Sequence, residues 1–378
     1  MVQGNGLLNL RLIKSNYARL AAVALFGVMA CEANDPVPSS TTGGGPNGLG
    51  CDADSNVTQV DGEQCAPLAD DYTPREDGSA NDTWPECISD DNLYHPFDPS
   101  VGTNARTGAF DQIGLLLGFG GRLVPDAQDF IDARVLYTVD EGIESRVSRR
   151  EDEHYPKAPM SCRDLTPDQQ LQYADRCVGP AQIQPILNQA FQEGAEGIDP
   201  VQNSARIEAA LLWFFYLSSH KEAITCTEVQ KDCDSSTAYY AGGQEREDLA
   251  GLARYVKSRS AQAHDRIWDG LLAVRCWRDL DNPTDIATDI ALRDRAVAQL
   301  DRGLLRGVAL IVRQRAQRLA CGPAWETVRI LGKVLLREAM ERDPAQAAVL
   351  RAEIEKDDPA AVDAPAVVAA LDAIFPCP

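Results

Sequence analysis

Helix-start signals recur through the second half of this chain. Between residues 166 and 344 a capping residue or a glycine stands before a proline six times, at Thr166-Pro167, Gly179-Pro180, Asp199-Pro200, Asn282-Pro283, Gly322-Pro323 and Asp343-Pro344. Proline is favoured at the first helical position, and Ser, Thr, Asp or Asn directly before it. Thr166, Asp199 and Asp343 also have Gln three residues later, which completes the pattern of a capping box. So many starts favour helices over strands.

The spacing of apolar residues agrees with these signals. Apolar side chains recur at steps of three and four, which is typical of amphipathic helices. They predict long helices at 199–224, 244–279, 284–318 and 323–342, and shorter ones at 107–118, 126–138, 180–194 and 364–374. Residues 210–217 are apolar all round, so the helix at 199–224 is expected to be central. We therefore expect an all-α multi-helix bundle, most simply one α-helical domain over 101–378.

The first thirty residues read as a signal peptide. Arg11, Lys14 and Arg19 precede the apolar stretch 20–30, which is shorter than the roughly 20 residues that a membrane-spanning helix needs. The stretch ends in Val28-Met29-Ala30-Cys31, which resembles the lipobox of bacterial lipoproteins. This resemblance implies cleavage before Cys31 and a lipid on that cysteine. Glu32 in place of Asp then points to the outer membrane; a secretory signal with another cleavage site is the alternative.

Two irregular segments follow the signal. Residues 31–50 are rich in Pro, Gly, Ser and Thr and are expected to form a flexible tether. Residues 51–100 are acidic, contain cysteines and lack apolar periodicity, so we expect an irregular segment pinned by disulfides. The whole chain carries a formal net charge of −21, and this acidity argues against nucleic acid as a partner.

The cysteines indicate disulfides. Export implies an oxidising compartment, and ten cysteines remain when Cys31 is set aside. No two of them stand closer than Cys226 and Cys233, which argues against a structural zinc site with C-x2-C spacing. Sequence cannot fix connectivity. A preference for local pairs predicts five bridges: Cys51–Cys65, Cys162–Cys177, Cys226–Cys233, Cys276–Cys321 and Cys87–Cys377.

Histidines and carboxylates supply the candidates for chemistry. His220 and His264 could bind a transition metal with Glu208, Glu222 and Asp265, although the Glu-x-x-His spacing of di-iron bundles is absent. The favoured interpretation is that both are structural histidines whose rings are hydrogen-bonded. The charged segment 140–155 contains His154 beside carboxylates, which could bind a metal or transfer protons. The favoured interpretation of this segment is a charged surface.

Three further patterns are weaker. The acidic loop 52–63 offers Asp52, Asp54, Asn56, Thr58 and Asp61 at the alternate spacing of calcium loops, and Glu63 stands twelfth from Asp52. Val57, however, occupies the position where an EF-hand needs Gly, so a solvated acidic loop is favoured. Gly242-Gly243 could be a joint or allow a ligand to approach closely. Gly303 and Gly307 have the spacing of closely packed helices.

The sequence therefore predicts a cellular location and a fold rather than a specific activity. The sequence contains no G-x-S-x-G motif of serine hydrolases, no H-E-x-x-H motif of metalloproteases, no phosphate-binding loop and no dinucleotide-binding motif. The helical part weakly resembles imelysin-like extracytoplasmic domains, which are associated with metal uptake, but their G-x-H-x-x-E motif is absent around His220. The leading hypothesis is a membrane-anchored envelope lipoprotein that binds a protein partner or small ligand. The alternatives are a metal- or solute-binding protein of an uptake system, or an envelope hydrolase.

Overall fold

The computed structural model describes residues 54, 57–60, 66–75, 83–139, 142–243, 245–247 and 249–376, which all belong to the compact unit Gly44–Pro378. The predicted signal peptide, the tether, the lipid on Cys31, and Cys51, Cys65 and Cys377 lie outside the described residues. Within those residues the chain forms thirteen α-helices and no strand, which confirms the all-α prediction. None of the described helices is both long and apolar enough to cross a bilayer.

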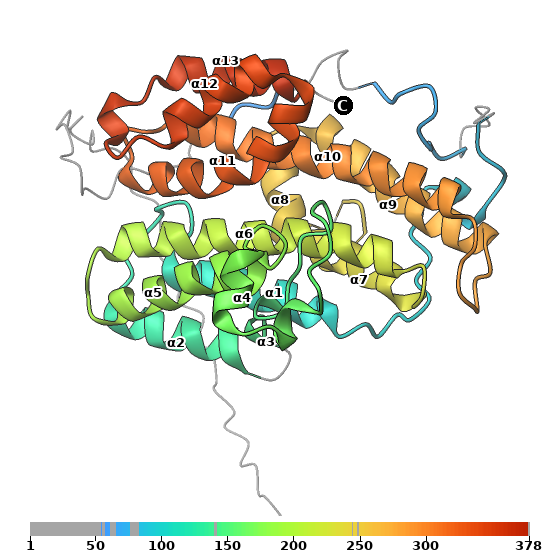
Figure 1. The fold of residues 1–378 in the computed structure, drawn as a ribbon, viewed down its shortest axis with the longest axis horizontal. Helices are drawn as coiled ribbons and strands as arrows, with labels where there is room; N and C mark the ends of the chain where they lie inside the picture. Colours follow the sequence, from blue (N-terminus) through green and yellow to red (C-terminus); the bar gives the residue numbers. More distant parts are fainter. Residues whose placement is uncertain are drawn as a thin grey trace, which may run out of the picture. The chain divides into compact units, whose positions relative to one another are not determined.

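The helices follow one another along the chain, and the longest connection between two of them runs from α3 to α4 (Figure 1). Their bounds are α1 Thr103–Leu117, α2 Ala127–Thr138, α3 Glu144–Val147, α4 Pro167–Gln172, α5 Gln184–Ala195, α6 Pro200–Thr225, α7 Lys231–Ala241, α8 Gly251–Lys257, α9 Ala261–Leu280, α10 Ile290–Ala316, α11 Gly322–Arg342, α12 Pro344–Ile354 and α13 Ala364–Ile374. A π-helix, Gly179–Ile183, runs directly into α5, and 3-10 turns at Ile88–Asp91, Cys162–Asp164 and Pro359–Ala361 complete the regular structure of the described residues.

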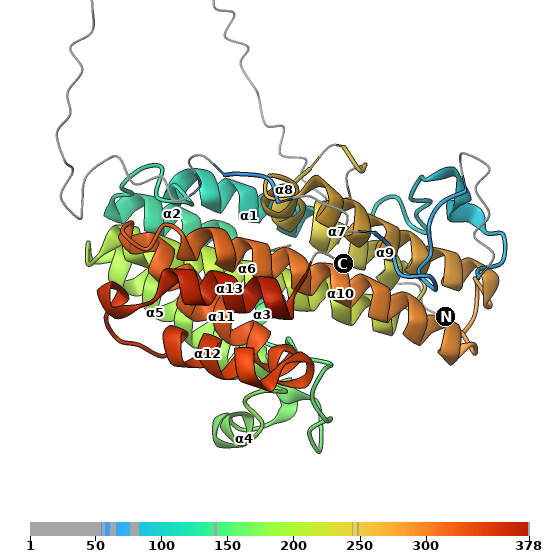
Figure 2. The ribbon, with the colours of Figure 1, turned by 90° about the horizontal axis from the view of Figure 1, so that it is seen from above.

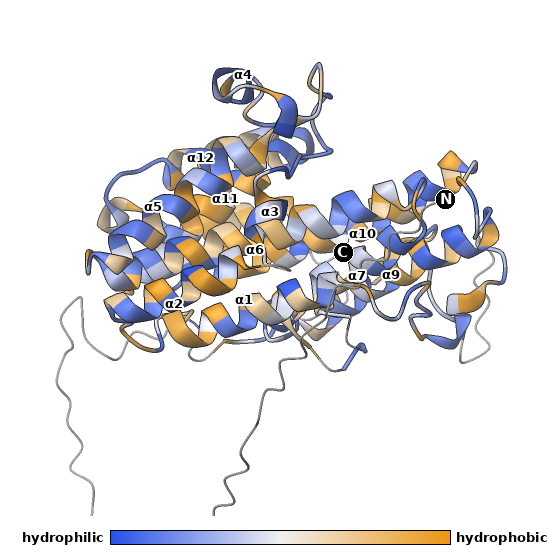
Figure 3. Cartoon of the chain, turned by 90° about the horizontal axis from the view of Figure 1, so that it is seen from below, coloured by the Kyte–Doolittle hydropathy of each residue, from blue (hydrophilic) through white to orange (hydrophobic). Residues whose placement is uncertain are grey.

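Helix α6 lies at the centre of the bundle, as its apolar sequence predicts. It packs against α5, α7, α10 and α11 (Figures 1 and 2), and its residues from Ile207 to His220 are all buried. Figure 3 shows apolar residues concentrated along α6 and the helices around it. A helix without a polar face can be stable only when neighbours cover every side of it.

Helices α9 and α10 form the most extensive pair of described helices and contribute to the same core. A Cβ atom at Gly270 of α9 would lie 2.6 Å from the Leu300 Cα atom of α10, and one at Gly303 would lie 2.9 Å from Ile267. The glycines therefore let the two helix backbones approach closely. Helix α10 continues this packing to α11 and α13, so it joins the central layer to the C-terminal helices.

Most of the helix starts predicted from a cap or proline are correct. Helices α4, α6, α11 and α12 begin at the expected prolines or one residue before, and Thr166 forms the expected capping box, although Asp199 makes no side-chain cap. The single helix predicted at 244–279 is wrong, since Ser260 caps a new helix and separates α8 from α9. The start predicted at Asn282-Pro283 is also wrong, because α10 begins at Ile290 with Asp289 as its cap.

Three disulfides lie within the described residues. Cys162–Cys177 and Cys226–Cys233 confirm the local pairs, whereas Cys87 is bonded to Cys276. This bond overturns both predicted long-range pairs, because the 3-10 turn Ile88–Asp91 packs on α9 and places Cys87 against that helix. Cys321 is disulfide-bonded to a residue outside the described ones. The bond of Cys87 fastens the irregular acidic segment to the bundle.

Candidate functional site

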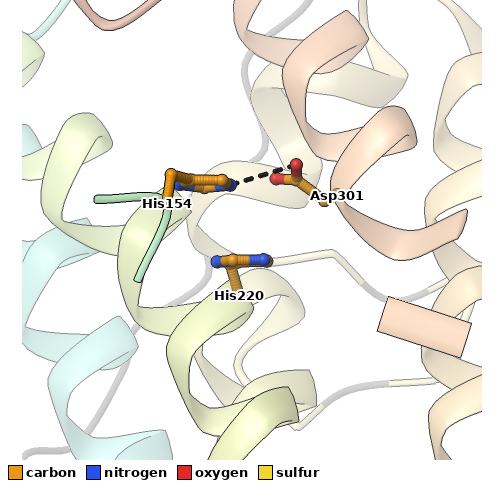
Figure 4. A group of neighbouring side chains, drawn as sticks. All are labelled: His154, His220 and Asp301. Carbon is orange, nitrogen blue, oxygen red and sulfur yellow. Dashed lines mark hydrogen bonds and ion pairs between the residues drawn. The ribbon is translucent and has the colours of Figure 1, made fainter. Parts of the chain in front are cut away.

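Three side chains from distant parts of the chain meet beside the packed helices α6 and α10. His154 comes from the loop after α3, His220 from α6 and Asp301 from α10 (Figure 4). One nitrogen of each histidine and one carboxylate oxygen of Asp301 all lie within 4.8 Å of one another. No other group of this kind occurs in the part of the chain that the structure describes.

A buried arginine shapes the loop that carries His154. The guanidinium of Arg176, which is 5 % exposed, donates to the Glu151 and Glu153 carboxylates at 2.9 and 3.0 Å. It also donates to the carbonyl oxygens of Asp152 and Tyr155, at 3.0 and 3.2 Å. The disulfide next to Arg176, Cys162–Cys177, closes the segment that follows this loop. A loop held by so many bonds presents His154 to α6 in a defined position.

His154 lies between two carboxylates. Its Nδ1 is 2.6 Å from Asp152 Oδ1, and its Nε2 is 3.1 Å from Asp301 Oδ2. A ring with a carboxylate at each nitrogen donates from both, so it is an imidazolium. Burial disfavours this charge, but the two hydrogen bonds and the two negative charges outweigh burial and raise the pKa of His154 to about 10.

Asp301 is the acceptor of this cluster. Its second oxygen, Oδ1, accepts a hydrogen bond of 3.1 Å from the hydroxyl of Tyr216. Burial alone would raise the pKa of Asp301, but the nearby imidazoles of His220 and His154 and the hydrogen bonds from His154 and Tyr216 lower it well below its ordinary value. The carboxylate is therefore ionised at neutral pH.

His220 differs from His154 both in its charge and in the hydrogen bonding of its ring. Its ring stacks on that of His154 with centroids 4.1 Å apart and planes inclined by 7°, and it is 5 % exposed (Figure 4). Burial lowers the pKa of His220 to about 4, so the ring is neutral. Its Nδ1 is buried and has no hydrogen-bond partner among the described residues. Leaving such an atom unsatisfied costs about 1–3 kcal/mol.

This donor set is one that binds transition metals. Two imidazoles and one carboxylate supply three protein ligands and leave further positions open, as in many catalytic zinc and iron sites. Asp152 on His154 and Tyr216 on Asp301 are the outer hydrogen bonds that typically orient metal ligands. Imidazole nitrogens donate in the ring plane, so binding through both rings requires them to leave the parallel stack.

The structure does not bring His264 to this site. The Nδ1 of His264 accepts from the Tyr240 hydroxyl at 2.8 Å, and its Nε2 lies 3.0 Å from the Arg246 carbonyl oxygen, so both nitrogens are satisfied. The carboxylates proposed with it are engaged elsewhere. Glu208 accepts from Tyr255 and Arg315, Glu222 pairs with Arg150, and Asp265 pairs with Arg246.

Sequence reasoning missed Asp301, although a signal was present. Asp301 stands four residues after Val297 and three before Leu304, so it falls on the apolar face of its helix. A carboxylate at such a position needs a buried partner. The partner is His154, in the segment that the favoured interpretation assigned to a charged surface.

The acidic loop 52–63 is described only in part. The Asp54 carboxylate binds the guanidinium groups of Arg259 and Arg315 at 2.5 and 3.1 Å, and both arginines are buried. The other carboxylates proposed for calcium, Asp52, Asp61 and Glu63, lie outside the described residues, as does Asn56.

Comparisons of the chain with models of known protein families, with characterised proteins and with solved structures found no match.

Proposed function

We propose that this protein is a lipid-anchored metal-binding protein of the cell envelope, and that its helical domain binds a divalent transition-metal ion through His154, His220 and Asp301. The observation that carries the proposal is the neutral, buried ring of His220 with an unpartnered nitrogen, stacked beside the ion pair of His154 and Asp301. A neutral imidazole is the form of histidine that binds metals.

The charges of the site fit a dication. Asp152 and Asp301 contribute two carboxylates, and the proton that His154 holds between them is the only positive charge within hydrogen-bond reach of both among the described residues. A metal ion that replaces the His154 Nε2 proton would keep Asp301 paired and leave the hydrogen bond to Asp152 in place. Two nitrogen ligands favour zinc or iron over calcium, which prefers six to eight oxygen ligands.

The test uses full-length protein extracted from membranes without chelators. We expect about one equivalent of transition metal by elemental analysis and, after stripping, 1:1 titration with Zn²⁺ and a d–d spectrum with Co²⁺. His220→Gln and Asp301→Asn should each weaken Zn²⁺ binding by about 100-fold or more, and Asp152→Asn by about 10- to 100-fold.

His95→Gln is the matched control for this test. His95 is a histidine outside the cluster, paired with Asp91 at the surface, and its loss should leave Zn²⁺ affinity unchanged. Wild-type protein that takes up no Zn²⁺ or Co²⁺ would refute the proposal. Equal Zn²⁺ affinity in wild type and His220→Gln would refute the assigned ligands.

The anchor is tested separately. The lipobox-like run Val28-Met29-Ala30-Cys31 supports lipidation, so Cys31→Ala should release the processed protein from the membrane fraction. Processed Cys31→Ala protein that still sediments with membranes would show that the lipid anchor is wrong, whatever the outcome for the metal.

A further inference from the structure

A second site lies where the irregular segment meets α1, α7 and α9. It is a pocket of about 550 Å³, within the range of small-molecule sites. Its lining includes Tyr94, Asn104, Asp234, Gly243 and Trp268, which come from five different parts of the chain. Neither the metal proposal nor the membrane anchor involves any of these residues.

The outer wall of the pocket is a built structure. Asp234 of α7 is 3 % exposed, and its carboxylate accepts from the backbone N–H groups of Phe97 and Asp98 at 3.1 and 2.7 Å and from the Tyr94 hydroxyl at 3.0 Å. The guanidinium of Arg275 lies 3.8 Å from the centre of the Phe97 ring. A wall fixed in this way is pre-organised, which lowers the cost of binding.

The pocket also holds polar groups without protein partners. Trp268 is 1 % exposed and lines the pocket, yet its indole N–H donates to no atom of the described residues. The Asn104 side-chain oxygen, also at the pocket, accepts from none. A Cβ atom at Gly243 would lie 2.4 Å from that oxygen, so a larger residue at this position would displace the Asn104 side chain. The site thus offers one donor and one acceptor next to aromatic rings.

The charge around the pocket is negative. Asp98, Asp234, Glu245 and Glu247 line it, and Arg246 is the one arginine or lysine among the lining residues, although Glu247 is paired with Lys257 at 2.6 Å. Arg246 is itself neutralised by two carboxylates of α9, Asp265 and Asp269, at 3.7 and 2.6 Å. Lining carboxylates of this number attract cations and repel anions.

We propose that this pocket binds a small organic amine, with its ammonium group toward Asn104 and the acidic rim, its apolar body against Tyr94 and Trp268, and a hydrogen-bond acceptor on the Trp268 indole N–H. Aromatic rings favour such a cation, both by burying its carbon skeleton and through the negative face of the ring. The proposal rests on the pocket alone and holds with or without a metal at His220.

The probes are tyramine and its anionic counterpart 3-(4-hydroxyphenyl)propanoate, titrated calorimetrically into the full-length protein. Both have the same ring and hydroxyl group and differ in charge. Tyramine should bind 1:1 and at least about tenfold more tightly, a difference of about 1.4 kcal/mol. The double variant Asp98→Asn/Glu245→Gln should lose about tenfold in affinity for tyramine. Glu355→Gln, which removes a carboxylate at the exposed end of α12, should lose none.

The Trp268 contact has its own readout. In wild type, tyramine should bind more tightly than 2-phenylethylammonium, which lacks the hydroxyl acceptor; in Trp268→Phe this preference should disappear even if the variant is less stable. An anion that binds as tightly as tyramine, an unchanged affinity in the double variant, or no heat of binding with millimolar tyramine would each overturn the proposal.

Discussion

Raising the pH from 7 to 9 in the presence of a chelator should destabilise the folded protein through His154. The pKa of His154 is raised from 6.5 to about 10 in the folded state. Between these values the folded protein keeps a proton that the unfolded chain has lost, so the free energy of unfolding falls by about 1.4 kcal/mol for each pH unit. The contribution is complete below pH 6.5 and is lost as the pH rises through about 10. From pH 7 to 9 the loss is about 2.5 kcal/mol.

In the folded protein the neighbours of His154 with shifted pKa values do not titrate between pH 7 and 9. The lowered pKa values of His220 and Asp301 leave both groups deprotonated throughout, and the raised pKa of Tyr216 keeps its hydroxyl protonated. The groups that face the two rings are Asp152 from the same loop, Tyr216 from α6, Asp301 from α10 and Arg337 from α11. The three groups with shifted pKa values, His220, Asp301 and Tyr216, therefore do not account for a fall in the free energy of unfolding between pH 7 and 9.

Urea unfolding of wild type and His154→Gln at pH 7, 8 and 9 measures the effect. The midpoint multiplied by the m-value gives the free energy of unfolding at each pH. Lys and Tyr side chains elsewhere titrate in both proteins, so only the difference between the two pH profiles is interpreted. Wild type should lose about 2.5 kcal/mol more than the variant over this interval. Parallel profiles would refute the doubly hydrogen-bonded imidazolium at the site.

Two further predictions concern stability. The pKa values of His220 and His264 are both lowered to about 4, so their contributions are complete above pH 6.5 and are lost as the pH falls toward 4; urea midpoints should drop over this interval, and less so in His264→Asn. Replacing both cysteines of Cys87–Cys276 by alanine, which opens a loop with a separation of 189 residues, should cost about 5 kcal/mol by the chain-entropy relation, against about 2.5 kcal/mol for Cys226–Cys233 with a separation of 7. Thermal unfolding checks this order, and a reversed order would contradict it.

The sequence predicts the helices well because their signals are local. Thr166 and Asp343 cap α4 and α12, and the apolar run of α6 correctly indicates a central helix. The predictions fail where the apolar spacing continues but the helix is interrupted. The apolar spacing continues past Ser260. The hydrogen bond from the Ala263 N–H to the Ser260 hydroxyl, at 2.9 Å, marks the start of a new helix there.

The candidate site could be predicted only in part. His220 shares a helix face with Tyr216, and this spacing is visible in the sequence. Its neighbours are not, because the fold of the loop around Arg176 places His154 and the packing of α6 against α10 places Asp301. Cys87–Cys276 illustrates the same limit. Contacts between elements far apart in sequence depend on packing that no local pattern encodes.

The two buried histidines of the helices differ in how their ring nitrogens are hydrogen-bonded. His264 makes a hydrogen bond with each ring nitrogen, so its burial is compensated within the fold. His220 is stacked on a charged ring and has a buried nitrogen that no described residue satisfies.

Folding alone gives no reason for the unsatisfied nitrogen of His220, because an apolar residue at that position would leave no buried polar atom without a partner. A bound dication would satisfy His220 and use both carboxylates. The unsatisfied nitrogen of His220 is therefore a group whose burial a bound dication would compensate.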